Sequence, residues 1–206
     1  MRMKTSSATQ RTVGRPREFD YDQVLDAAIR QFTLTGYHGS SISLLSQATG
    51  LTAGSLYKAF NDKRSLFLAA LTRYVDINNQ RLETSLSAAG NGMQHLRILL
   101  DHYLVNSSGD TGRLGCLVVT SASELACGDP EIAAQIARLM ARYHQRFVRY
   151  LQQGIADGSV RADLDPQATA SLLVALSQGL RVLGKSGFSL QQADDIRQSI
   201  LKLTLP

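Results

Sequence analysis

Three residues that suit contact with a nucleic acid lie close together in the sequence: Gly54, Ser55 and Lys58. They share a short predicted helix with Leu56 and Phe60, which are four residues apart and therefore lie on one face. When this apolar pair packs inward, the glycine, the serine and the lysine face outward near the start of the helix. That end of a helix meets the edges of the bases when it lies in the major groove of DNA.

The distribution of charge favours a polyanionic partner for the same part of the chain. Residues 1–74 contain ten Lys and Arg against five Asp and Glu, an excess of +5 that equals the formal net charge of the whole protein. The remaining 132 residues are balanced, with 12 basic and 12 acidic side chains. Such an asymmetry is typical of proteins that bind nucleic acids through one segment. A basic tail without a partner is the alternative that charge alone leaves open.

The elements that must position these residues are short helices separated by glycines. The predicted helices span residues 21–35, 42–49 and 53–60, and a fourth begins at Lys63. Asp20 and Gln23 form a capping box before the first helix, and Gly36 ends it. Gly50 provides the turn between the second helix and the third. Two short helices joined by a glycine turn, after a longer supporting helix, predict a helix-turn-helix unit.

The rest of the chain is also predicted to be helical. Asp129-Pro130 and Asp165-Pro166 are typical starts of helices. Further helices are predicted over residues 93–105, 116–126, 130–153, 167–183 and 189–203, with a Ser/Gly/Asp loop over residues 106–112. No alternating strand pattern of useful length occurs. The sequence therefore predicts an all-α fold of about nine helices.

Composition sets the broad class of the protein. The chain has 206 residues, of which 44% are hydrophobic, so it can bury a substantial core. No stretch approaches the roughly 20 apolar residues that a membrane-spanning helix requires. Residues 1–17 are polar and basic, unlike the apolar segment of a signal peptide. We therefore expect a cytoplasmic protein.

Three segments resemble the TetR family of bacterial transcriptional regulators. They are Val24-Leu-Asp-Ala-Ala-Ile-Arg-Gln-Phe, Gly36-Tyr37 and Thr52-Ala-Gly-Ser-Leu-Tyr-Lys-Ala-Phe-Asn-Asp-Lys63. The resemblance covers residues 15 to about 75. It implies a three-helix DNA-binding domain over residues 18–74 and a helical domain over residues 75–206 that dimerises and holds an inducer. Residues 1–17 are polar and basic and lack apolar periodicity, so they are expected to form a flexible arm.

The same resemblance implies which residues contact the DNA backbone. Carried over by position, Tyr57 donates a hydrogen bond to a phosphate through its hydroxyl, and Lys63 contacts a phosphate from the start of the fourth helix. Ala59 departs from the family pattern, which often has His or Tyr at this place. The departure removes one expected contact to a phosphate or a base. The operator sequence therefore cannot be predicted from the amino-acid sequence.

The remaining DNA-binding residues are polar, glycine or lysine residues of the two short helices. Thr52 and Ser55 can bond to phosphates or to base edges, and Gly54 lets the backbone approach closely. Lys58 is the expected reader of a guanine. Ser41, at the start of the second predicted helix, completes the expected DNA-binding set.

The basic arm contains Arg15 and Arg17 around a proline. A stiff, extended arginine pair of this kind suits a narrow minor groove that is rich in A·T pairs. An arm that makes only nonspecific phosphate contacts is the alternative.

A ligand site is expected among the central helices of the C-terminal part. Its candidate residues are apolar or small polar side chains, with one thiol and one imidazole: Leu100, Tyr103, Cys116, Val119, Thr120, Ser123, Met140, Tyr143, His144 and Phe147. Any such set taken from one sequence mixes core residues with pocket residues.

Cys116 invites a redox hypothesis. It follows Gly115 at a predicted helix start, where backbone dipoles lower the pKa of a thiol. The run Gly-Cys-Leu and the later Glu124 resemble a branch of the family that contains electrophile-sensing repressors. A small buried apolar role is the alternative for a lone cysteine. If Cys127 lies on the same helix, about 16 Å separates the two, too far for an intrachain disulfide.

Catalysis and metal binding are not expected. His95 and His102 are seven residues apart and stand roughly 10 Å apart on a helix, so one metal ion cannot bridge them directly. No nucleophile–base pair, metal cluster or phosphate-binding loop occurs at a credible spacing. The sequence therefore predicts no enzyme, no cofactor and no metal.

The resemblance also implies a homodimer built from the last two helices. In the helix over residues 167–183, small residues would let the partner helix approach closely: Ala168, Ala170, Ala175 and Gly179. Leucines of the same helix would supply the apolar area of the interface: Leu172, Leu173, Leu176 and Leu180. The expected function is a repressor that binds palindromic double-stranded DNA and is released by a small molecule or an electrophile. The alternative is a DNA-dependent interaction protein whose C-terminal part binds another protein.

Overall fold

The computed structural model describes residues 19–206, and within this range the chain forms ten helices and no strand. The helices are α1 (Tyr21–Gly39), α2 (Ile42–Thr49), α3 (Ala53–Phe60), α4 (Lys63–Leu86), α5 (Gly92–Ser107), α6 (Gly109–Leu114), α7 (Leu117–Leu125), α8 (Pro130–Ala156), α9 (Pro166–Lys185) and α10 (Leu190–Thr204). The prediction of an all-α fold is confirmed. The additional element is α6, a short helix that occupies most of the predicted loop over residues 106–112.

The helices begin where short polar side chains can accept hydrogen bonds from free backbone N–H groups. The side chains that cap helices in this way are Asp20, Ser41, Thr52, Asp62, Asn91, Asp129, Asp165 and Ser189. Asp129 and Asp165 are each followed by a proline in the first turn, as predicted. Asp20 accepts from the backbone of Gln23, but this helix start lacks the reciprocal bond of a full capping box.

The first helix is interrupted at Gly36, where the sequence predicts its end. Gly36 has φ 74° and ψ 176°, a conformation that side chains with a Cβ rarely adopt. Helical geometry resumes for one short turn, and α1 then ends at Gly39. The backbone amides of this turn point away from the regular helix and become available to another part of the protein.

The first four helices form a head around one apolar core. Leu45 of α2, Leu56 and Phe60 of α3, and Phe32 of α1 are almost fully buried together. Gly50 supplies the left-handed turn between α2 and α3, with φ 70° and ψ 10°. This packing confirms the predicted helix-turn-helix and fixes which face of α3 points outward.

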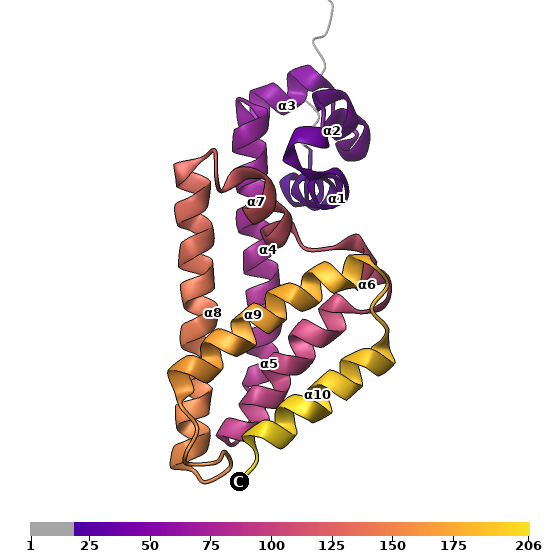
Figure 1. The fold of residues 1–206 in the computed structure, drawn as a ribbon. Helices are drawn as coiled ribbons and strands as arrows, with labels where there is room; N and C mark the ends of the chain where they lie inside the picture. Colours follow the sequence, from indigo (N-terminus) through magenta and orange to yellow (C-terminus); the bar gives the residue numbers. More distant parts are fainter. Residues whose placement is uncertain (1–18) are drawn as a thin grey trace, which may run out of the picture.

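The apolar core of the head continues into the C-terminal part. Leu117 and Leu125 of α7 and Ile132 and Leu139 of α8 belong to the same buried cluster as the head residues. In Figure 1, α7 lies close to the head, beside α4, and α8 runs alongside α4. The predicted domain boundary at residues 74 and 75 falls inside α4, which is continuous, so the domain limits stay a prediction.

A second apolar cluster holds the remainder of the body together. It combines the lower part of α4 with α5, the second half of α8, α9 and α10. Figure 1 shows α9 and α5 running obliquely across α4, with α10 at the edge of the body. None of the helices in residues 19–206 is both long and apolar enough to cross a membrane.

Candidate functional site

The outward face of α3 carries most of the predicted DNA-binding residues. Thr52, Gly54 and Lys58 are exposed, and 47% of Tyr57 is accessible. Ser55 is half-buried, and its hydroxyl lies 3.0 Å from that of Thr52. The helix-turn-helix packing thus presents a polar outward face on α3, with one positive charge at Lys58 in its last turn.

The hydroxyls at the starts of the two short helices already cap those helices. Thr52 Oγ1 accepts from the Ser55 backbone N–H at 3.2 Å, and Ser41 Oγ accepts from the Leu44 N–H at 3.2 Å. A hydroxyl that accepts in a cap keeps its own proton to donate. Both exposed side chains therefore remain able to donate to a phosphate oxygen.

Lys63 lies within the head rather than extended into solvent. Its Nζ donates to the backbone oxygens of Tyr37 at 3.1 Å and Ser40 at 3.2 Å, and lies 4.3 Å from the centre of the Tyr37 ring. An ammonium has three N–H donors. Two of them join the end of α1 to the start of α4, and the predicted phosphate contact depends on the third.

The predicted minor-groove contacts of Arg15 and Arg17 lie outside the residues that the structure describes.

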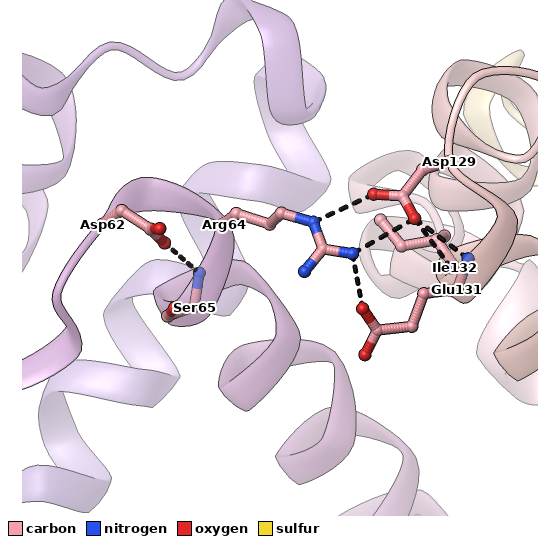
Figure 2. Close-up of polar contacts among 6 residues, drawn as sticks. All are labelled: Asp62, Arg64, Ser65, Asp129, Glu131 and Ile132. Atoms are coloured by element: carbon pink, nitrogen blue, oxygen red, sulfur yellow. Dashed lines mark hydrogen bonds and ion pairs between the residues drawn. The ribbon is translucent and has the colours of Figure 1, made fainter.

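An ion-pair cluster joins the head to the start of α8 (Figure 2). Arg64 Nε and Nη2 donate to the two Asp129 carboxylate oxygens at 2.9 and 3.1 Å, and Nη2 also contacts Glu131 at 2.7 Å. The hydrogen bonds from Arg64, and the one from the Ile132 N–H, hold the pKa of Asp129 below its usual value. Asp129 therefore caps α8 and binds α4 with the same carboxylate.

A second polar contact joins the head to the end of α7. One carboxylate oxygen of Glu124 accepts from the backbone N–H of Tyr37 at 2.8 Å and of His38 at 3.3 Å. These two amides are free because Gly36 interrupts α1 just before them. A Cβ on Gly36 would overlap the Glu124 carboxylate, so the glycine also makes room for this contact.

A small polar cavity lies between α4, α5, the start of α7, α8 and α9. Its volume is about 40 Å³, enough for one or two water-sized groups and far below the 300–1,000 Å³ typical of drug-sized ligand sites. The lining residues are Tyr74, Asn78, His102, Tyr103, Asn106, Cys116, Val118, Tyr143, Gln178 and Arg181. Three predicted ligand residues are among them: Tyr103, Cys116 and Tyr143.

The other predicted ligand residues lie outside this cavity. Leu100 and Phe147 are buried in the second apolar cluster. The His144 ring instead contacts α9, with Nε2 3.2 Å from the Gln167 backbone oxygen and 3.1 Å from Ser171 Oγ. The remaining four are half-buried or exposed and do not line the cavity: Val119, Thr120, Ser123 and Met140.

Sequence reasoning missed Arg181, the most unusual residue of the cavity. It is a charged residue that is only 9% exposed on the inner face of α9, where Leu173, Ser177, Leu180 and Gly184 are also buried. The sequence pattern could have revealed it, because a single arginine on the apolar face of an amphipathic helix is unusual.

The Cys116 sulfur belongs to a buried polar group. Tyr74 Oη donates to Cys116 Sγ at 3.6 Å, and Arg181 Nη2 donates to Tyr74 Oη at 2.8 Å. Burial raises the pKa of the Cys116 thiol, but attraction to Arg181 and hydrogen bonds from Val119 N–H and Tyr74 outweigh it and lower the pKa overall. Burial, followed by repulsion from Cys116, raises the pKa of Tyr74, so this phenol keeps its proton.

Comparison with known proteins identifies the class to which this fold and surface belong. Residues 24–70 match the sequence model of the bacterial regulatory proteins of the tetR family, and residues 92–199 match that of the tetracyclin repressor-like C-terminal domain. The HTH-type transcriptional repressor ComR of Escherichia coli is 27% identical over 98% of this chain and 97% of its own. The HTH-type regulator YezE of Bacillus subtilis is 33% identical over 73% of each chain.

A solved structure has the same fold in a complex with DNA. The TetR family regulator CifR, substituted at three cysteines and complexed with a 26-base-pair operator, matches with a TM-score of 0.81 and 27% identity. The match covers 94% of this chain and all of that one. The protein is therefore a DNA-binding transcriptional regulator with a helix-turn-helix head. It belongs to the TetR family.

Replacing Glu124 by Ala should loosen the head from α7. The substitution removes the acceptor of the Tyr37 and His38 amides, so the free energy of unfolding should fall by about 0.5–1.5 kcal/mol and these two amides should exchange faster. Urea unfolding and hydrogen exchange measure both effects. Ser123→Ala, on the exposed side of α7, is the matched control. Unchanged exchange at both amides would contradict the anchoring role.

His102 should make the folded protein less stable in acid. Burial, then repulsion from Arg181 of α9, Arg146 of α8 and Arg81 of α4, lowers the pKa of His102 to about 4 from 6.5. Between these values the unfolded chain binds a proton that the folded protein does not. Stability should therefore be lost as the pH falls from about 6.5 to 4, by up to about 3 kcal/mol.

Urea unfolding of wild type and of His102→Gln across this pH range measures that contribution. The variant should lose most of the pH dependence, whereas His38→Gln, at an exposed position, should keep it. An unchanged slope in His102→Gln would show that other groups cause the acid sensitivity.

Proposed function

We propose that the protein is a homodimeric repressor that binds a palindromic operator and is released by a signal received in its C-terminal part. The observation that carries the proposal is the outward polar face of α3, held by a helix-turn-helix core in a fold shared with a regulator bound to operator DNA. Operator DNA lies in the bacterial cytoplasm, and we place the protein there. A dimer would set two copies of α3 into successive major grooves.

The dimer is supported by an exposed apolar face on α9. Leu172, Val182 and Leu183 are 62%, 57% and 50% exposed, although all three are large apolar residues. Ala175 and Gly179 lie between them at helical spacing and are also exposed, so another helix can approach closely. The exposed Leu190 of α10 adds apolar area. Ala170, Leu173 and Leu180, expected at this interface from the sequence, are instead buried inside the protomer.

The signal acts by favouring one of two arrangements of the heads. A ligand lowers operator affinity only by the difference between its affinities for the DNA-binding and the released conformation. The cavity of about 40 Å³ is too small for a drug-sized inducer without rearrangement. This size favours a small effector.

A covalent signal at Cys116 is a second form of the same proposal, and the lowered pKa of its thiol favours it. A small electrophile such as acrolein should then abolish operator binding by the wild type. Cys116→Ser should keep its operator binding after the same treatment, and Cys127→Ser, which changes the exposed cysteine, should behave as the wild type. Equal sensitivity of Cys116→Ser and the wild type would exclude Cys116 as the sensor.

A DNA-dependent interaction protein is the alternative function. The exposed apolar face of α9 also suits a partner of another sequence. The alternative would gain support if the purified protein were a monomer.

Selection from random duplex DNA is the direct test of operator binding. A two-fold symmetric site should be enriched, and Lys58→Gln should bind it about 5- to 150-fold more weakly and with relaxed preference at one base pair, the loss of one base contact. Arg142→Gln, an exposed charge change on α8, should bind as the wild type does. Salt-sensitive binding without an enriched sequence would contradict the proposal.

Replacing Leu172 by Lys should separate the dimer. A charge in the centre of a buried apolar interface is strongly unfavourable, so the mass in solution should halve and operator affinity should drop. Leu34→Lys is the control, because Leu34 is similarly exposed, at 56%, but lies on α1. Light scattering after gel filtration measures the mass. A Leu172→Lys protein that stays dimeric would place the interface elsewhere.

A further inference from the structure

Arg181 is a buried cation without a carboxylate partner among the described residues. Its Nη2 donates to Tyr74 Oη, and Nη1 donates to the Asn106 backbone oxygen. Both acceptors are neutral, and no Asp or Glu lines the cavity, but the Cys116 sulfur also contacts the guanidinium and carries a negative charge when it is ionised. A guanidinium has five N–H donors, so these two bonds leave others for a further acceptor.

The surroundings make this charge expensive to bury. A buried ion is normally paired, because the free energy lost with its hydration is offset only by an opposite charge with good geometry. The pKa of His102 falls to about 4, mainly through burial and then through repulsion from Arg181, so this neighbour stays neutral near pH 7. The cavity therefore has a positive potential as long as Cys116 is a protonated thiol.

Two phenols add unused donors to the same cavity. Tyr103 and Tyr143 line it, and no hydrogen bond from either hydroxyl occurs within residues 19–206. Burial is the main cause that raises the pKa of each phenol, so both remain protonated and can donate. The Gln178 amide offers a further donor at the wall. The cavity thus combines a fixed positive charge with neutral donors.

We propose that this cavity is a binding site for a small anion, held by Arg181 and by the hydroxyls of Tyr103 and Tyr143. The volume of about 40 Å³ restricts the ligand to a halide or to a carboxylate of one or two carbons. The inference rests on the proposed function where it treats the anion as the effector. Binding is tested without DNA, so failure of the anion site is distinct from failure of operator binding.

The Cys116 thiolate is the competing source of negative charge. Its sulfur lies in the same hydrogen-bonded group as Tyr74 and Arg181. If the thiolate neutralises Arg181 in the native protein, an external anion has no net charge to bind. The two sources are therefore separated by comparing the wild type with Cys116→Ser.

The experiment compares thermal unfolding of the full-length protein in sodium formate and in sodium gluconate at equal ionic strength. Gluconate is too large for the cavity and controls for general salt effects. Formate at ten times its Kd should raise the midpoint of the wild type by about 3–6 °C relative to gluconate. Arg113→Gln, at an exposed arginine, should respond equally, and Arg181→Gln should not respond.

A second variant keeps the test decisive if Arg181→Gln does not fold. The double change Tyr103→Phe and Tyr143→Phe keeps both rings and the arginine but removes two donors, so formate should bind at least tenfold more weakly by calorimetry. Formate binding as tight as in the wild type would overturn the proposal. A formate response that appears only in Cys116→Ser would also overturn it, because the thiolate would then be the native counter-charge.

Discussion

The orientation of the head depends on the anchoring of α1 to α7 through Glu124. The carboxylate takes two backbone amides that Gly36 releases by interrupting α1, and Arg64 adds an ion-pair cluster at the start of α8. Both contacts lie at the surface of the shared apolar core. The apolar core holds the head against the body. The polar contacts fix the orientation of the head, because hydrogen bonds and ion pairs are directional and apolar packing is not.

The same helix that holds the head also begins at the cavity. Cys116 is the N-cap residue of α7, and Glu124 lies in its last turn. The nine residues of α7 span only about 14 Å. The effector that we propose at this cavity would therefore bind beside the element that contacts the head, and α4, which carries Tyr74, is a second connection between the two.

Burial strengthens the interactions among the polar side chains of the cavity and shifts the pKa values of Tyr74 and Cys116. Tyr74, Cys116 and Arg181 come from three helices and perturb one another because little water screens them. The outward side chains of α3, in contrast, are exposed to solvent. Their helix is fixed by Leu56 and Phe60 inside the head, and their polar groups stay free to meet a partner. One fold thus keeps a solvated polar surface and a desolvated polar cavity apart.

The elements whose causes are local could be predicted from the sequence. Caps, glycine turns and the pair Leu56 and Phe60 define the helix-turn-helix, because these signals act within a few residues. The packing of the helices, in contrast, brings Arg181 to Cys116 and Glu124 to the amides after Gly36. These partners lie 65 and about 87 residues apart, and their meeting depends on how helices pack, which local patterns leave undetermined.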